Sequence, residues 1–475
     1  MMVTKPVAPA VSSRGQLKWI GLTIAVVVGL GITLLPTPQG LSRPAHLVLA
    51  IAAFSILLWV FQVMNNGIAS VLMMGLMVLA GVRPSLALSG FSSAQFWILL
   101  VVLYYGFAMQ RTGVAQRLSY YILSLFPGTY SGILWAFFLI GLILALGVPS
   151  MTVRTAIMVP IAWALVQSLG LGPRSRGTAL IMLTVVEMAV LPGLAFLYGS
   201  LNGPVVEAVF QGKHLPLSWT SYATVMTFPT LVLSILIVFA NQLVLKSEAP
   251  LGVSSSFAKE QLEAFGPIKR TEWVTAIVVI LSIAFWATAR THHLPSFLVG
   301  IFGLAVFGLV GIVDDADIAG GVSWTLLLFL GGIFSLATVI QEFQVADWLA
   351  GYMVPIANHL MFSVVLFLVV LALAMFVLRF LDPSGFVVIP VLFLPICDVA
   401  AANGIPPIVL MAPLLLASAP FWASYQNFWI AMGEGMTSGQ AYSAGQRIRL
   451  ANVYALICLI TVAISVAFWK LIRVF

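Results

Sequence analysis

Long apolar stretches separated by short polar turns fill almost the whole chain. Runs of roughly 18 or more apolar residues, enough for an α-helix to cross about 30 Å of hydrocarbon, recur from Trp19 to the C-terminus. Polar and apolar residues do not alternate at every second position, which argues against membrane-spanning β-strands. The pattern predicts an all-α polytopic membrane protein with about 11 transmembrane helices and two re-entrant hairpins.

The composition predicts a multi-pass integral protein of an inner, or plasma, membrane. Hydrophobic residues make up 61% of the 475 residues and charged residues only 7%, whereas a soluble domain is about one quarter charged. The first apolar run, 17–35, lacks a small-residue cleavage site and predicts a retained helix after a cytoplasmic tail, 1–16. Basic residues are scattered at helix ends despite a net charge of +7, which favours contact with the lipid bilayer over nucleic acid.

A polar segment, 245–271, divides the apolar chain into two membrane halves, 17–244 and 272–475. The segment FAMQRTGVAQRLSYYI, which starts at Phe107, is similar to TVIQEFQVADWLAGYM, which starts at Thr338. Two further pairs of landmarks follow in the same order. We interpret the halves as repeats that are inverted if each has an odd number of spans, as in many secondary transporters. The alternative is that two apolar chains look alike by composition alone.

Both halves contain apolar runs that are interrupted near the middle by proline, serine or glycine. Backbone groups left unpaired at such a break require surrounding protein or a wet cavity, so we expect re-entrant hairpins and discontinuous helices. The predicted hairpins cover 130–170 and 361–402, the predicted broken helices cover 178–210 and 405–432, and the last span covers 451–473.

The tip of the first predicted hairpin, Pro-Ser-Met-Thr-Val-Arg at 149–154, carries a specific pattern. It is similar to the Pro-Ser-Asn-Thr-Ala-Arg sequence of the citrate/succinate and plastid dicarboxylate exchangers, a branch of the divalent-anion/sodium symporter (DASS) family. The late segment 412–460 resembles that family's tenth helix, its broken Thr-Pro-Pro-Asn region and the lead into its last span. The resemblance implies a homodimer and elevator-type alternating access, in which a hairpin-bearing transport domain moves against a scaffold.

The resemblance and the polar breaks together select the candidate site residues. The predicted substrate-binding residues lie at the hairpin tips and in the broken helices: Ser150, Met151, Thr152, Arg154, Ser384, Gly385, Asn202 and Asn427. The predicted coupling-ion residues lie at the breaks or are carboxylates inside the apolar runs: Gly199, Ser200, Glu187, Asp382 and Ser424. No metal site is predicted, and the surroundings of Cys397 and Cys458 indicate packing rather than a disulfide.

Charged residues inside the apolar runs need a partner or a purpose, because each costs about 2.5–3.5 kcal/mol at mid-bilayer. Arg154 offers a guanidinium fork that fits a carboxylate, and the alternative is a structural ion pair with Asp382. A local pair with Arg379 is the simplest explanation of Asp382. Glu187 is interpreted as either a proton carrier or the counter-ion of Arg154.

The sequence predicts a secondary active transporter of small organic anions, di- or tricarboxylates, that works by exchange. Met151 and Gly385 stand where the family's tips carry asparagine, and a thioether suits Na⁺ poorly, so we expect sodium-independent transport. The alternatives are a sodium- or proton-coupled symporter and a carrier of sulfate or another oxyanion. No HExxH, GxSxG or phosphate-loop motif is present, so an enzyme is not predicted, and Na⁺ or H⁺ as a coupling ion is the only cofactor considered.

Overall fold

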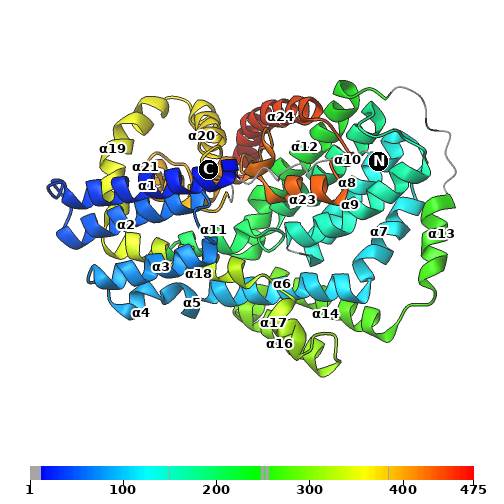
Figure 1. Ribbon diagram of the computed structural model, residues 1–475, viewed down its shortest axis with the longest axis horizontal. Coiled ribbons are helices and arrows are strands. Elements are labelled where there is room, and N and C mark those ends of the chain that lie inside the picture. Colours follow the sequence, from blue (N-terminus) through cyan, green and yellow to red (C-terminus); the bar gives the residue numbers. More distant parts are fainter. Residues whose placement is uncertain (1–11, 149, 248–250, 252–255, 383–384, 475) are drawn as a thin grey trace, which may run out of the picture. The chain divides into compact units, whose positions relative to one another are not determined.

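The computed structural model describes residues 12–148, 150–247, 251, 256–382 and 385–474. Throughout these ranges the regular secondary structure is helical, without strands, so the all-α prediction is confirmed (Figure 1). The chain divides into two compact units. The first unit comprises Met1–Ser92 and Trp324–Trp348, and the second comprises Ser93–Ser323 and Leu349–Phe475.

The first unit is built from the N-terminal helices and one helix from much later in the chain. Its helices are α1 (Ser12–Leu34), α2 (Arg43–Val60), α3 (Asn66–Leu79), α4 (Pro84–Ala87), α5 (Ser89–Ser92) and α18 (Trp324–Glu342). The backbone N–H of Gly90 donates to Ser335 Oγ at 2.9 Å, and Asn65 Nδ2 donates to Thr325 Oγ1 at 3.1 Å. These bonds tie α18 to the N-terminal helices within this unit.

The second unit contains the helices of both predicted hairpins. Its first part comprises α6 (Ala94–Thr112), α7 (Val114–Ser124), α8 (Tyr130–Gly147), α9 (Met151–Ser168), α10 (Arg176–Val190), the 3₁₀-helix η1 (Leu191–Ala195), α11 (Asn202–Gly212), α12 (Trp219–Val244) and α13 (Ser256–Phe265). It continues with α14 (Arg270–Ala287), α15 (Ala289–His292), α16 (Ser296–Leu309) and α17 (Asp315–Gly320). Its last part comprises α19 (Val345–Leu360), which begins at the boundary, α20 (Val364–Leu378), α21 (Val388–Ala402), α22 (Pro407–Leu416), the 3₁₀-helix η2 (Ser424–Gln426), α23 (Phe428–Met436) and α24 (Ala444–Leu471).

Eight helices of the described chain are long and apolar enough to cross a membrane. They are α2, α8, α9, α10 with its 3₁₀ extension, α12, α14, α18 and α24. The pair α6 and α7 makes a ninth if it is counted as one span bent by 67°. The bend falls at Gly113, whose φ of +85° is a left-handed conformation that glycine adopts without strain.

The range of each predicted hairpin contains two helices, α8 and α9 in the first and α20 and α21 in the second. Ser150 caps α9, because its Oγ accepts a hydrogen bond from Val153 N at 3.3 Å. Asp382 does the same for α21, since its Oδ2 accepts from Val387 N at 3.1 Å and from Val388 N at 3.2 Å. Polar residues at both tips therefore satisfy backbone donors that would otherwise be unpaired.

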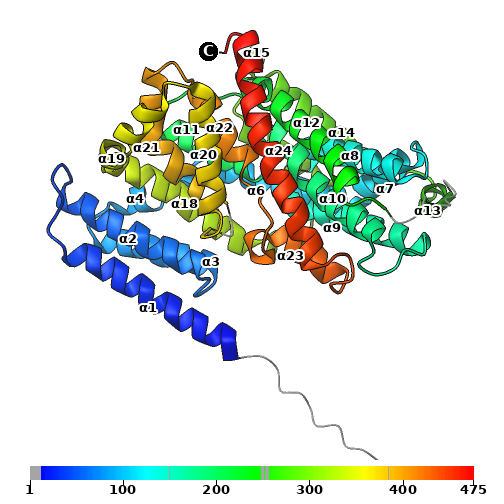
Figure 2. The same cartoon turned by 90° about the horizontal axis from the view of Figure 1, so that it is seen from above.

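The long helix α24 runs beside α12 in the second unit (Figure 2). Trp469 Nε1 donates to Val225 O at 2.9 Å, and the rings of Phe228 and Phe468 stack with centroids 4.1 Å apart. Near the other end of α24, Tyr454 is fully buried and its hydroxyl donates to Leu416 O at 2.5 Å. The last helix thus supports both α12 and the end of α22.

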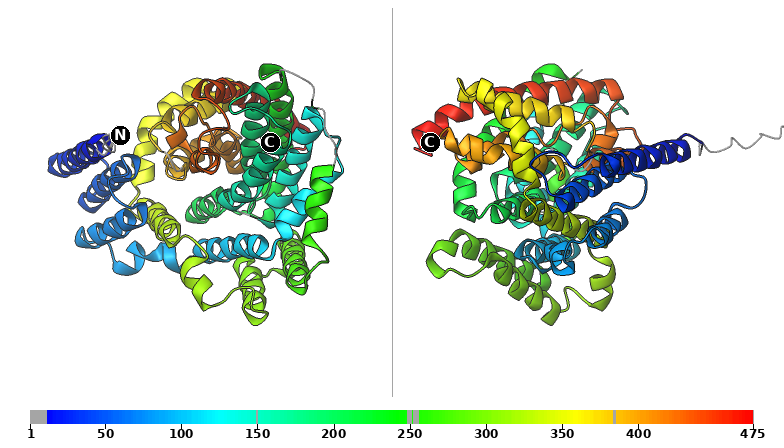
Figure 3. Two further views of the ribbon diagram at one scale, coloured as in Figure 1. Left: turned by 45° about the vertical axis from the view of Figure 1, so that its right-hand side comes forward. Right: turned by 90° about the vertical axis from the view of Figure 1, so that its left-hand side faces the viewer.

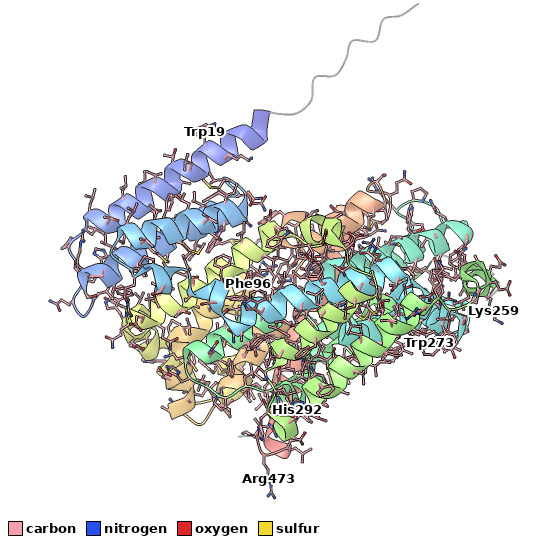
Figure 4. The ribbon with its side chains drawn as sticks, turned by 90° about the horizontal axis from the view of Figure 1, so that it is seen from below. Trp19, Phe96, Lys259, Trp273, His292 and Arg473 are labelled. Carbon is pink, nitrogen blue, oxygen red and sulfur yellow. The ribbon has the colours of Figure 1, made fainter. Side chains whose placement is uncertain are left out.

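Helices α14 and α16 also lie side by side in this unit (Figure 3). Tyr105 on α6 joins them, because its hydroxyl lies 2.8 Å from Ser282 Oγ and 3.4 Å from Gly300 O. Figure 4 places Lys259 of α13 and Trp273 toward one end of α14, and His292 just beyond its other end. Helix α13 and the turn at His292 therefore lie at opposite ends of α14.

Candidate functional site

Arg154 is completely buried in the first turn of α9, and backbone carbonyls take up its donors. Nε donates to Ala189 O, and Nη1 donates to both Val148 O and Gly199 O, each at 2.6 Å. Nη2 donates more weakly to Val190 O at 3.4 Å. These oxygens come from the hairpin tip and from both sides of the break between α10 and α11, so the guanidinium closes the break.

Two glycines let the backbone approach this guanidinium. A Cβ atom at Gly193 would collide with Arg154 Nη2 and with the carbonyl oxygen of Gly199. A Cβ atom at Gly199 would in turn collide with the carbonyl oxygen of Gly193. The break in this helix therefore depends on two residues without side chains.

Arg379 serves the second half of the chain in the same way. It is fully buried just after α20, and its Nε donates to Ser418 O at 2.8 Å. Nη2 donates to Gln426 O at 2.6 Å and to Asn427 Oδ1 at 2.7 Å, and Nη1 donates to the backbone oxygen of Asp382. Three of these acceptors flank the break between α22 and α23, which Arg379 closes.

The two breaks are joined by a hydrogen bond between the halves of the chain. Asn202 at the start of α11 is buried, and its Nδ2 donates to Ser418 Oγ at 3.4 Å. Asn427 at the start of α23 uses its other side-chain atom to donate to Pro420 O. Two residues predicted to bind substrate, Asn202 and Asn427, therefore lie at one polar centre formed by both broken helices.

The remaining predicted substrate residues lie at the hairpin tips. Ser150 and Met151 are buried, Thr152 is half-buried, and all three lie at the start of α9. Gly385 has φ +77°, and a Cβ atom there would lie 3.2 Å from Arg379 Cζ. Ser384, like Pro383, lies outside the described residues.

Two of the predicted coupling-ion residues present their oxygens to arginines. Gly199 O accepts from Arg154, as described above, and Ser424 Oγ accepts from Arg447 Nη1. Arg447 also forms an ion pair with Glu434 Oε1 at 2.6 Å. Guanidinium groups thus hold the oxygens that a coupling cation would need at these two positions.

The carboxylates of the coupling-ion set have different surroundings. Asp382 caps α21 through its side chain and contacts Arg379 through its backbone oxygen. Glu187 lies on α10, where Oε2 accepts from Asn241 Nδ2 at 2.6 Å. Within the described part of the chain, Glu187 forms no ion pair with Arg154, and the four hydrogen bonds that Arg154 donates all go to carbonyl oxygens.

Sequence reasoning missed two residues of this centre. Ser418 accepts from Asn202 through its hydroxyl and from Arg379 through its carbonyl. Gln426 is fully buried, its Oε1 accepts from Ala423 N at 2.9 Å, and its Nε2 has no partner among the described residues. The tetrapeptide Ser-Tyr-Gln-Asn in a predicted break was the available signal, but only its asparagine matched the family pattern.

A buried polar centre where apolar helices break is typical of membrane carriers that bind small solutes near the middle of the bilayer. The fold and the site together therefore define a multi-pass integral membrane transporter.

The family follows from comparison with known proteins. The chain belongs to the DASS family, because the model of the "Sodium:sulfate symporter transmembrane region" matches residues 16–475. The expected family is therefore confirmed.

Individual relatives are distant but extend over most of the chain. The chain is 24% identical to "Dicarboxylate transporter 1, chloroplastic" of Spinacia oleracea over 408 residues, 82% of this chain and 71% of that protein. It is 25% identical to "Inner membrane protein YbhI" of Escherichia coli over 438 residues, 90% of this chain and 86% of that protein. The crystal structure of the YdaH transporter of Alcanivorax borkumensis shares the fold, with a TM-score of 0.57 at 12% identity over 96% of this chain and 97% of that one.

Proposed function

We propose that this protein exchanges small dicarboxylates across an inner, or plasma, membrane without using sodium. The substrate class is suggested by two relatives, the chloroplastic dicarboxylate transporters of Spinacia oleracea and Arabidopsis thaliana. The membrane is suggested by the name of the inner membrane protein YbhI.

The observation that carries sodium independence is the pair of buried arginines at the two breaks. Carbonyl and amide oxygens are the ligands that hard cations such as Na⁺ prefer. In each half these oxygens already surround a guanidinium, Arg154 in the first and Arg379 in the second. The chain therefore carries its own cations at the centre, and the positive charge does not leave with the substrate.

A permanent charge of this kind suits exchange rather than net uptake. An empty carrier retains two buried guanidiniums without the anion, which is costly to move through the low-dielectric membrane interior. A dicarboxylate bound at the centre offsets that charge in both directions of the cycle. We infer that reorientation is fast only when an anion is bound, which makes transport an obligatory exchange.

Direct contacts with the anion are assigned to groups that the arginines leave available. The hydroxyl of Ser200 and the Nε2 of Gln426 are buried and have no partner among the described residues. The N-termini of α9, α11 and α23 add partial positive charge that favours a carboxylate. Ser150, Thr152 and Ser384 at the tips complete the proposed binding set, with Met151 and Gly385 as close backbone contacts.

The proposed mechanism is alternating access of the elevator type in a homodimer. The hairpin helices and broken helices would move together as one body, because the buried arginines and the bond between Asn202 and Ser418 hold them to one another. The scaffold and the contact between protomers are proposed from the resemblance to the family.

Counterflow in proteoliposomes tests this function. Vesicles loaded with unlabelled malate or succinate should accumulate the labelled acid at the same rate in sodium and in choline buffer, and empty vesicles should not. A large stimulation of uptake by sodium in unloaded vesicles would instead identify the protein as a sodium symporter. Uptake driven by an inward proton gradient without counter-substrate would favour proton symport, and exchange of labelled sulfate but not carboxylates would make it an oxyanion carrier.

A further inference from the structure

A second buried polar group lies one turn before the break that Arg154 closes. Glu187 is 1% exposed, and Asn241 on the neighbouring helix α12 is 0% exposed. Every other residue of α10 from Gly177 to Val190 is also buried, most of them apolar. An ionised carboxylate in such surroundings is costly unless a cation or several donors compensate it.

The donors that reach Glu187 come from one amide. Asn241 Nδ2 has two hydrogens, and it donates one to Glu187 Oε2 at 2.6 Å and the other to Thr184 Oγ1 at 3.0 Å. Both hydrogens are therefore used, which fixes the orientation of the amide. These two bonds leave the amide oxygen Oδ1 as an unused acceptor.

Two oxygens of this pair lack a donor. Glu187 Oε1 and Asn241 Oδ1 are both buried and have no hydrogen-bond partner among the described residues. Both atoms are acceptors as long as the carboxylate is ionised. A single hydrogen between them would satisfy both, and it would turn the pair into a carboxylic acid and a carboxamide joined by two hydrogen bonds.

We propose that Glu187 and Asn241 form a proton-binding site, in which a proton on Glu187 Oε1 is donated to Asn241 Oδ1. The proton comes from water, which leaves a hydroxide, or from a hydronium ion, so the site gains one positive charge and becomes neutral. Glu187 and Asn241 are not among the residues proposed to bind the anion, and the shared proton explains how a carboxylate is kept in α10 without an ion pair.

The neighbouring titratable groups do not supply an alternative counter-charge. Helices α8, α9, α12, α23 and α24 pack against α10. From α24, Tyr454 is near enough to interact electrostatically with Glu187 and with Cys458, and neither a phenol nor a thiol can carry a positive charge. Arg154 of α9 donates to carbonyls, and Glu434 of α23 pairs with Arg447. The titratable groups of α8 and α12, Tyr130 and Tyr222, are neutral phenols; Tyr130 lies against Gly177 at the start of α10, and Tyr222 donates to Leu194 O.

A metal cation fits this site less well than a proton. A hard cation such as Ca²⁺ takes six or more oxygen ligands, whereas only two oxygens of the pair lack a donor. The described residues also contain no group of three His, Cys, Asp or Glu side chains that could hold a metal ion. One N–H of Asn241 points toward the carboxylate and would repel a cation placed there.

Infrared spectroscopy of the purified protein in lipid tests the site without relying on transport. Glu187→Gln keeps both hydrogen bonds, because its amide donates to Asn241 Oδ1 and accepts from Asn241 Nδ2. We expect the difference between wild type and E187Q at neutral pH to show the C=O band of a protonated acid, and that band should shift in Asn241→Leu. Glu434→Gln is the matched control, and it should remove ionised carboxylate bands, since Glu434 is paired with Arg447.

The outcomes separate the site from its alternatives. Loss of ionised carboxylate bands in E187Q would overturn the proposal, and a dependence of those bands on sodium would assign the site to a metal cation. An acid band that does not shift in N241L would overturn the pairing with Asn241.

The effect on transport rests on the exchange function proposed above. We expect wild-type exchange to decline at alkaline pH, where the proton leaves Glu187. We expect E187Q to exchange within about twofold of wild type at acidic pH, since both hydrogen bonds are kept, and to show no such decline. Parallel pH profiles of wild type and E187Q would overturn the link to transport. If neither exchanges any carboxylate, the proposed function fails while the infrared result still decides the proton site.

Discussion

Arg154→Ala should convert a sodium-independent protein into a sodium-dependent one. The substitution removes the guanidinium but leaves the carbonyl oxygens of Val148, Ala189 and Gly199, each now bonded at 2.6 Å, around the vacated space. These oxygens are suitable ligands for a small hard cation. Sodium is therefore expected to enter the space and restore part of what the substitution removes.

The magnitude follows from those three bonds. A buried acceptor left without a donor costs about 1–3 kcal/mol, so three cost about 3–9 kcal/mol. The variant no longer has to bury a charged guanidinium, and the desolvation free energy saved in this way offsets part of the loss. A cation present at about 100 times its Kd returns about 2.7 kcal/mol by mass action. The variant should unfold at a clearly lower temperature than wild type in choline buffer, and sodium should reverse part of that shift.

The assay measures thermal unfolding and counterflow in sodium and in choline, for R154A and wild type side by side. Arg174→Ala is the control, because Arg174 is exposed and its Nε donates to Gly439 O at 2.9 Å, so water can replace the lost bond. The reasoning is refuted if R154A resembles wild type in choline, or if sodium stabilises wild type and R154A equally.

Three further outcomes follow from the same structure. Gly193→Ala should destabilise the protein and abolish exchange, because the added methyl group collides with Arg154 Nη2. The control Gly435→Ala on α23 has no atom within 4 Å of the new carbon, so it should be neutral in the same unfolding and counterflow assays. Arg379→Lys should lose most exchange at normal expression, since an ammonium cannot reproduce the fork that reaches three separate carbonyls; wild-type counterflow would contradict this. The pKa of Asp314 lies below its ordinary value because its carboxylate accepts a hydrogen bond from the backbone N–H of the third residue of α17. As the pH falls, this helix cap should therefore persist until the pH is below the usual range of aspartate pKa values. A ¹³C NMR titration of labelled carboxyl groups, with Asp314→Asn to assign the signal, measures that pKa.

The all-α membrane fold was predictable because apolar length is a strong signal. A bilayer leaves helices few alternatives, so long runs without charge become helices wherever they occur. The family was predictable from the tip at 149–154 and the segment 412–460. In contrast, the assembly of α18 with the first helices depends on packing between residues more than two hundred positions apart, such as Gly90 with Ser335, which no periodicity reveals.

The candidate site was only partly predictable, because the partners of a charged side chain are invisible in a linear pattern. Arg154 and Glu187 were both selected as charges that require an explanation, but the hydrogen bonds of each go to other groups. Arg154 is bonded to main-chain oxygens, which every residue has, so no residue type marks them. Asn241 lies in an ordinary apolar helix, and its importance follows only from its distance to Glu187.

The hydrogen bonds of Arg154 to described residues all go to main-chain oxygens, and this has a consequence for how the centre tolerates sequence change. The residues at 189 and 190 supply carbonyl groups to Arg154, so their side chains can change while these bonds are kept. What must be preserved is the place where each helix breaks and the glycines that allow it. The centre therefore depends on backbone conformation more than on residue identity, and a search for conserved residues will overlook proteins that have retained the same backbone conformation.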